Sequence, residues 1–134
     1  MSTSTQESFN LDLPELRPDE EQRKADVLNG VAVVANQKSD KGLIQWAKAN
    51  ELAVYIGRGS VYGNPFVISK EATRDDVCND YENKYLPFQP SIIAKLPKLK
   101  GKVLLCYCYP ERCHGDTLAA LTKKPASGSM MPAY

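Results

Sequence analysis

The sequence has little that would tie it to a membrane or a secretory route. No apolar run approaches the ~20 residues that a membrane-spanning helix needs, so we expect no membrane contact. Residues 1–10 have neither the basic nor the apolar region of a signal peptide, which predicts a cytoplasmic location. There are four cysteines, and in a cytoplasmic protein these are expected to be free thiols, metal ligands or site residues rather than a disulfide framework.

Net charge is also nearly absent, but the small total of +1 hides an uneven distribution. Residues 1–26 contain seven acidic and three basic residues, whereas residues 27–134 contain nine acidic and fourteen basic residues. A mildly basic body is compatible with a nucleotide or nucleic-acid ligand, and equally with a solvated lysine-rich face.

The length of 134 residues predicts one domain with one modest core. Residues 1–26 are rich in Ser, Thr, Gln, Pro and acids and lack a sustained apolar period, so we expect a flexible acidic N-terminal arm. Residues 125–134 have the composition of a flexible tail. The single α/β domain is then expected at residues 27–124.

Within that domain, strand and helix patterns alternate. The apolar, β-branched runs predict strands at 30–35, 52–56 and 102–106, with 66–68 as an extension of the sheet. Capping residues and apolar stripes predict helices at 40–50, 73–86 and 90–96, and another that begins at Thr117. The alternation predicts an α/β fold with a mostly parallel sheet and covering helices.

A glycine-rich segment, residues 56–66, follows the second predicted strand. Glycines just past a strand can leave backbone N–H groups free to hold a phosphate, and an arginine can add a bidentate contact. The segment is not a Walker loop, because no Gly-Lys-Ser/Thr follows. The alternative is a glycine-rich turn whose arginine pairs with a nearby acid. The candidate ligand-binding residues are Gly57, Arg58, Gly59, Ser60, Gly63 and Asn64.

The segment 104–116 contains three of the four cysteines and the only histidine. A zinc site is disfavoured, because only one residue separates Cys106 from Cys108, whereas structural zinc sites usually space paired cysteines by two to four residues. We therefore expect no metal and no other cofactor.

A nucleophile is the other interpretation of this segment. Cys113 precedes a predicted helix N-terminus that would favour its thiolate, and His114 and Asp116 are candidate acid–base groups. The structural alternatives are that Cys106 and Cys108 are small core residues and that Asp116 caps the helix beginning at Thr117.

The two segments together resemble the family known as domain of unknown function 4326. The resemblance rests on Tyr55-Ile56-Gly57-Arg58-Gly59-Ser60 leading to Gly63-Asn64-Pro65-Phe66, and on Cys106, Cys108, Pro110, Cys113, His114, Gly115 and Asp116, with Arg74 and Tyr81 between them. It spans roughly residues 30–121. Tyr107 and Gly59 depart from the Trp and Pro that are frequent in the family. The resemblance implies a compact Rossmann-like domain of a kind found in bacteria and phages, so a phage protein would act in the host cytoplasm.

Three hypotheses about function remain open. The first is a domain that handles a nucleotide or nucleoside, including an enzyme acting on a nucleotide or modified base, with N-glycosidic hydrolysis or transfer as one conceivable reaction. Its site would combine Cys113, His114 and Asp116 with the glycine-rich segment, and its partner would be a small phosphorylated ligand. The second is a non-enzymatic binder of a nucleotide or nucleic acid, and the third is a structural zinc module. The sequence leaves the oligomeric state open.

Overall fold

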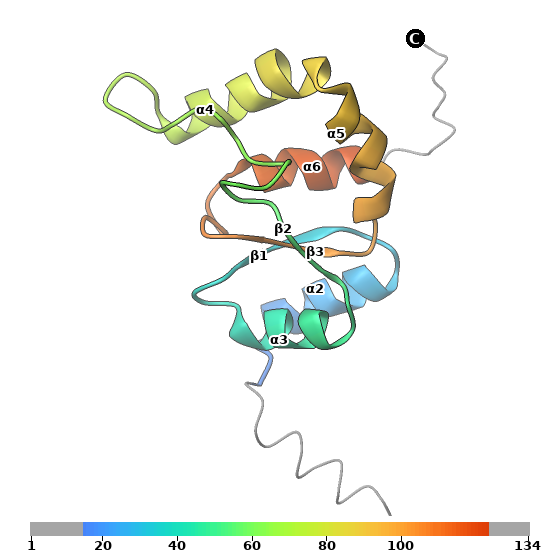
Figure 1. The fold of residues 1–134 in the computed structure, drawn as a ribbon. Helices are drawn as coiled ribbons and strands as arrows, with labels where there is room; N and C mark the ends of the chain where they lie inside the picture. The colour runs from blue at the N-terminus through green and yellow to red at the C-terminus, as the bar shows by residue number, and fades with distance from the viewer. Residues whose placement is uncertain (1–14, 124–134) are drawn as a thin grey trace, which may run out of the picture.

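The computed structural model describes residues 15–123, and a sheet of three short strands lies at its centre (Figure 1). The strands are β1 (Val33–Asn36), β2 (Ala53–Tyr55) and β3 (Val103–Cys106). All three are parallel, and β3 lies between β1 and β2. The expectation of a small α/β fold with a parallel sheet and covering helices is confirmed.

Helices cover both faces of this sheet (Figure 1). One face carries α2 (Pro18–Leu28) and α3 (Lys41–Ala49), and the other carries α4 (Arg74–Asp80), α5 (Pro90–Lys95) and α6 (His114–Thr122). Short helical turns at Tyr81–Tyr85, Leu86–Phe88 and Leu96–Leu99 extend α4 and α5. The chain thus passes from β1 through α3 to β2 at the opposite edge, and returns through α4 and α5 to the central β3.

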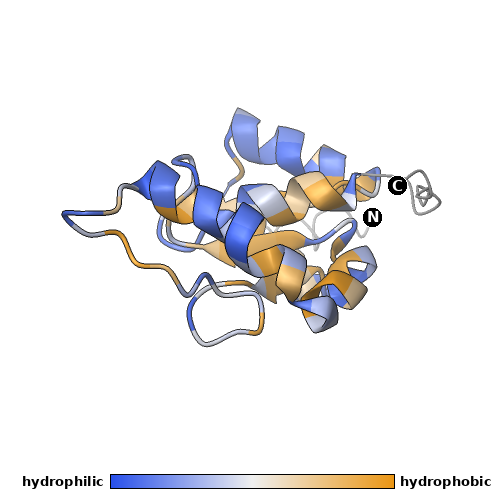
Figure 2. Ribbon diagram, turned by 90° about the horizontal axis from the view of Figure 1, so that it is seen from above, coloured by the Kyte–Doolittle hydropathy of each residue, from blue (hydrophilic) through white to orange (hydrophobic). Residues whose placement is uncertain are grey.

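Strand alternation divides the core into two clusters, one on each face. Val103 and Leu105 pack with Leu43 of α3, whereas Leu104 and Cys106 pack with Leu118 of α6. All four strand residues are buried. Figure 2 shows the apolar strands between helices whose outer surfaces are largely hydrophilic. A fully buried central strand explains why residues 103–106 are apolar without alternation.

Two elements differ from the expectation. No strand forms at residues 66–68, which lie in an irregular segment. Pro65 has no N–H group, and the Phe66 N–H already donates to Asn64 Oδ1 at 2.9 Å. Neither residue can therefore donate a backbone hydrogen bond to a neighbouring strand. The last helix begins at His114 rather than Thr117, because Cys113 is its N-cap and accepts the Gly115 N–H through Sγ.

The N-terminal boundary also lies earlier than expected. Much of α2 falls inside the expected arm, residues 1–26, yet α2 packs on the sheet through buried Glu20 and Arg23. Glu20 Oε2 accepts the Leu43 N–H at 3.0 Å, and Arg23 forms an ion pair with Asp40 at 3.0 Å. Because buried polar contacts anchor this helix, its sequence shows no sustained apolar period from which its packing on the sheet could be predicted. The expected arm at 1–14 and the expected tail at 125–134 lie outside the described residues.

Candidate functional site

A pocket of about 440 Å³ opens where the carboxyl ends of the strands meet. Cys106 at the end of β3, Tyr55 at the end of β2 and the start of α6 all contribute to its lining. Its outer wall comes from α4 and from the irregular segment that follows β2. Parallel α/β sheets bind ligands at this edge, outside the carboxyl ends of their strands.

The pocket brings together some of the predicted site residues and not others. Five of the nine line it, namely Gly57, Arg58, Asn64, Cys113 and His114. The remaining four are not part of its lining, namely Gly59, Ser60, Gly63 and Asp116. The two sequence segments therefore converge on one pocket, as their positions after β2 and β3 predict.

The glycine-rich segment is held mainly by contacts within itself. Ser60 Oγ donates to the Gly57 carbonyl oxygen at 2.7 Å, and the Ser60 N–H donates to the same oxygen at 3.0 Å. Asn64 Nδ2 donates to the Val77 carbonyl oxygen of α4 at 3.1 Å. A Cβ atom on Gly57 would lie 2.5 Å from the Tyr55 hydroxyl oxygen. These residues thus shape the wall of the pocket, and a side chain at Gly57 would have to displace the Tyr55 ring.

Three arginines line the pocket, and their surroundings differ. Arg74 Nε pairs with Glu111 at 3.0 Å, and Arg112 pairs with Asp75 at 3.1 Å. The exposed Arg58 has no hydrogen bond or ion pair through its guanidinium to any other residue between 15 and 123. The expected alternative, a pairing of Arg58 with a nearby acid, is therefore not seen in this part of the chain.

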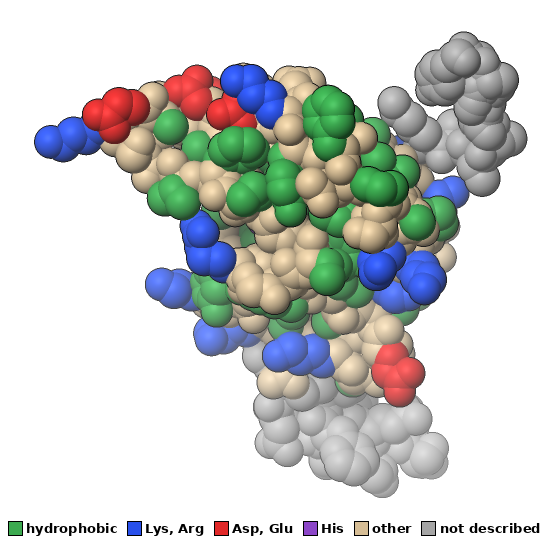
Figure 3. Space-filling model, turned by 45° about the horizontal axis from the view of Figure 1, so that its top comes forward, with side chains coloured by type: hydrophobic (Ala, Val, Ile, Leu, Met, Phe, Trp, Pro, Cys, Tyr) green, Lys and Arg blue, Asp and Glu red, His purple; other side chains and the backbone are tan. Residues whose placement is uncertain are grey.

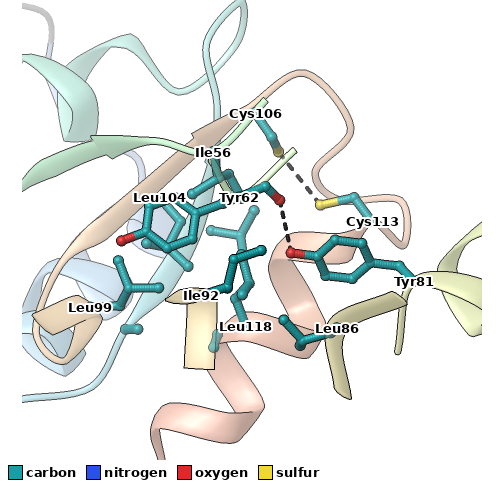
Figure 4. Close-up of a cluster of buried hydrophobic side chains, with 13 residues drawn as sticks. Ile56, Tyr62, Tyr81, Leu86, Ile92, Leu99, Leu104, Cys106, Cys113 and Leu118 are labelled. Atoms are coloured by element: carbon teal, nitrogen blue, oxygen red, sulfur yellow. Dashed lines mark hydrogen bonds between the residues drawn. The ribbon is translucent and has the colours of Figure 1, made fainter. Parts of the chain in front are cut away.

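Two of the thiols in the pocket form a close pair. Cys113 donates to Cys106 across a sulfur–sulfur distance of 3.7 Å, and both residues are buried (Figure 4). The Cys113 thiol and the backbone N–H groups of Cys108 and Tyr109 donate to Cys106 and lower its pKa, although burial opposes this. The same hydrogen bond, together with burial, raises the pKa of Cys113.

Cys108 lies beyond the strand that contains Cys106. Strand β3 ends at Cys106, and Cys108 packs partly buried against the same core cluster as Cys106. Among residues 15–123, no three His, Cys, Asp or Glu side chains are grouped so that they could hold a metal ion.

His114 and Asp116 are both engaged at the start of α6. His114 Nε2 lies 2.6 Å from the Ile56 carbonyl oxygen, and its ring packs edge-on against Tyr81. Burial lowers the pKa of His114, and the Ile56 contact opposes this only in part. Asp116 Oδ2 accepts the Cys113 N–H at 3.1 Å and completes a capping box. The helix that Asp116 caps begins at His114, three residues before the expected start.

Sequence reasoning missed the residues that hold the segment 107–113 in place. Asn36, at the end of β1, donates through Nδ2 to the carbonyl oxygens of Tyr107 and Tyr109, at 3.2 and 2.8 Å. The Arg23 guanidinium lies 4.2 Å from the centre of the Tyr109 ring. On the other side, Arg74 donates to the Arg112 carbonyl oxygen at 3.2 Å. A polar residue ending a strand is the one signal that pointed to Asn36; nothing local pointed to Arg23 or Arg112.

Comparisons with known proteins identify a family but no activity. A family model described as a domain of unknown function, DUF4326, matches residues 36–124, a span that contains the whole of the pocket lining. No curated protein and no solved structure was found to match. Separately, no helix between residues 15 and 123 has the length and apolar character to cross a bilayer.

Proposed function

We propose that this chain, which belongs to the DUF4326 family, binds a nucleotide in the pocket at the carboxyl ends of β2 and β3. One observation carries the proposal: Arg58 lines the pocket and has no acidic partner in residues 15–123. A guanidinium left unpaired beside a pocket is suited to a bidentate contact with a phosphate.

The other two arginines support an anion without competing for it. The guanidinium group of Arg74 pairs with Glu111. That of Arg112 pairs with Asp75 and donates to Asn79. They position the segment 107–113 against α4, and their remaining positive field adds to that of Arg58 at short range. The phosphate is therefore assigned to Arg58.

The rest of the pocket fits the base of a nucleotide. Its wall contains large apolar or aromatic side chains, several of them exposed, namely Tyr55, Phe66, Val67, Ile68 and Tyr107. Aromatic rings give a stacking surface for a base. The volume of about 440 Å³ lies in the range of roughly 300–1,000 Å³ that small-ligand sites occupy. Figure 3 shows apolar side chains gathered on one face of the molecule, with lysine and arginine side chains around them.

The test is a calorimetric titration with nucleoside monophosphates, the matching nucleosides and inorganic phosphate. Arg58→Ala is expected to keep the parent's melting temperature and to weaken monophosphate binding about 10- to 150-fold, because a charge-assisted hydrogen bond contributes ~1.5–3 kcal/mol. Arg58→Lys should recover only part of this affinity, since an ammonium lacks the planar fork.

Lys48→Ala is the matched control, because it removes one exposed positive charge from α3 on the opposite face of the sheet. It should bind as the parent does. Equal binding of monophosphate and nucleoside by the parent, or unchanged affinity in Arg58→Ala, would remove the basis for a phosphate site at Arg58.

The same samples separate an enzyme from a binder. The hypothesis that Cys113, His114 and Asp116 act on a bound nucleotide, including cleavage of its N-glycosidic bond, stays a prediction. Chromatography of the incubated complexes tests it: release of free base supports the enzyme, and intact nucleotide after prolonged incubation supports the non-enzymatic binder.

A further inference from the structure

We propose that Cys106 and Cys113 form a redox pair, in which a small hydroperoxide oxidises Cys106 and Cys113 resolves the product to a disulfide. The pair lies in the pocket lining, where the end of β3 meets the N-terminus of α6 (Figure 4). This inference does not depend on the binding of a nucleotide.

Distance sets these two thiols apart from the other cysteines. Their sulfur atoms are 3.7 Å apart, and a disulfide bond is about 2.05 Å long, so the sulfurs have about 1.7 Å to close. All four cysteines line the pocket, but among residues 15–123 only this pair shows a contact between sulfur atoms. In this part of the chain, no other pair of cysteines has its sulfur atoms close enough to form a disulfide after so small a shift.

The surroundings give the two sulfurs different roles. Cys106 accepts two hydrogen bonds, from the Cys108 N–H at 3.4 Å and from the Cys113 thiol, whereas Cys113 accepts the Gly115 N–H at 3.3 Å and donates its own proton. The hydrogen bond from Cys113 therefore lowers the pKa of Cys106, and the same hydrogen bond together with burial raises the pKa of Cys113. Cys106 is therefore the nucleophile, because the thiolate is the reactive form, and Cys113 keeps its proton until it resolves.

Burial limits the oxidant to a small molecule. Cys106 and Cys113 are each 3% exposed, so a protein disulfide cannot reach them, while the pocket admits a molecule the size of a hydroperoxide. Cys78 is also buried, but burial raises its pKa, and this disfavours its thiolate. Cys108 is more accessible than the pair and serves as the internal comparison.

The reaction balances in two steps. The Cys106 sulfur attacks the terminal oxygen of the hydroperoxide, the O–O bond breaks, and the departing alkoxide takes a proton to become an alcohol. Cys106 is oxidised by two electrons to a sulfenic acid. The Cys113 sulfur then attacks the Cys106 sulfur, the S–O bond breaks, and hydroxide leaves as water with the Cys113 proton. A dithiol reductant reverses the result by exchange.

Hydrogen peroxide is the probe, applied to the reduced full-length chain at pH 7. The parent should lose two of its four thiols and 2 Da of mass, as one disulfide forms. Peptide mapping should find a Cys106–Cys113 link that dithiothreitol removes. Cys113→Ser should instead accumulate a sulfenic acid at Cys106 that a 1,3-diketone traps. Cys106→Ser should oxidise at least about 10-fold more slowly than the parent, since it lacks the thiol that accepts hydrogen bonds from Cys108 and Cys113.

Cys78→Ser and Cys108→Ser are the matched controls and should form the same link at the parental rate. A link through Cys78 or Cys108, or oxidation of Cys106→Ser at the parental rate, would overturn the assignment. So would a parent whose thiols all survive a peroxide dose that oxidises free glutathione. The peptide map of the parent identifies the linked cysteines by itself, so it tests the assignment even where a variant fails to fold.

Discussion

The Nε2 atom of His114 lies 2.6 Å from the carbonyl oxygen of Ile56, and this contact ties the first residue of α6 to the segment that follows β2. A carbonyl oxygen can only accept, so Nε2 carries the proton and Nδ1 is the unprotonated nitrogen of the neutral ring. Both the segment that follows β2 and the start of α6 line the pocket. The contact between His114 and Ile56 therefore fixes the distance between these two parts of the lining.

The first prediction concerns the pH dependence that His114 imposes. Burial lowers the pKa of His114 below 6.5, against opposing effects of Ile56 and Asp116. As pH falls below 6.5, the unfolded chain takes up this proton first, so the free energy of unfolding should fall by up to about 1.4 kcal/mol per pH unit. Urea unfolding between pH 5 and pH 8, at intervals of about half a pH unit, measures the free energy of unfolding as a function of pH.

His114→Gln keeps an N–H donor but cannot titrate, so its free energy of unfolding should change less over the same range. The chain has no other histidine, which leaves the comparison free of a second imidazole. Parallel curves for the parent and His114→Gln below pH 6.5 would contradict a buried, neutral His114.

The second prediction concerns Asn36 and the segment that carries the cysteines. Asn36→Ala removes the donor to the Tyr107 and Tyr109 carbonyl oxygens and should lower the free energy of unfolding by about 1–2 kcal/mol. Amide hydrogen exchange at residues 107–113 should become faster than in the parent, while exchange in β3 stays slow.

Asn36→Asp separates the two roles of this side chain. It retains an acceptor for the Lys38 N–H, which Asn36 Oδ1 binds at 2.8 Å, but loses the donor. Exchange at residues 107–113 should therefore resemble that of Asn36→Ala. Parental exchange in Asn36→Asp would mean that the amide donor does not hold this segment.

The third prediction concerns the buried ion pair beneath β1. Asp40 is 1% exposed and accepts from Arg17 and from both terminal nitrogens of Arg23. Asp40→Asn removes the buried carboxylate partner of Arg23 and leaves only the half-exposed Asp19, so it should cost about 3–5 kcal/mol of the free energy of unfolding. Combining it with Arg23→Met should recover part of that loss, as a double-mutant cycle in urea will measure. A double variant less stable than Asp40→Asn would contradict this account.

The fourth prediction concerns the reactivity of Cys106. The hydrogen bond from Cys113 lowers its pKa, so alkylation by iodoacetamide should reach half its maximal rate at a lower pH than that of an ordinary cysteine thiol. The groups that face this thiol are the Cys113 thiol, the Asp116 carboxylate and the N–H groups of Cys108 and Tyr109. Cys113→Ala removes the largest stabilising contact and should move the midpoint upward. Mass spectrometry of the Cys106 peptide gives the rates, and a parental midpoint near the ordinary value of 9 would contradict the hydrogen-bonded thiolate.

Local sequence was sufficient to predict the elements that form the frame of this site. The apolar run at 103–106 predicted the buried central strand, and the capping signal at Thr73 and Asp76 predicted α4 with its capping box. Because both glycine-rich and cysteine-rich segments follow predicted strands, their meeting at one edge of the sheet could also be predicted. Each of these inferences rests on short-range periodicity or on the shared geometry of parallel strands.

Tertiary structure alone decided how side chains pair inside that frame. The strand order β1-β3-β2, the contact of Cys106 with Cys113 and the partners of Arg74 and Arg112 depend on residues brought together from distant parts of the chain. Asp40, which the sequence marks as a helix cap, instead accepts from Arg17 and Arg23 of the α2 region. The sequence by itself determined that the segments after β2 and β3 meet at the pocket edge, because that depends on where each strand ends. Only packing decided that the pKa of Cys106 is lowered and that the Arg58 guanidinium has no partner within residues 15–123, because charge and acidity depend on neighbours that local sequence does not specify.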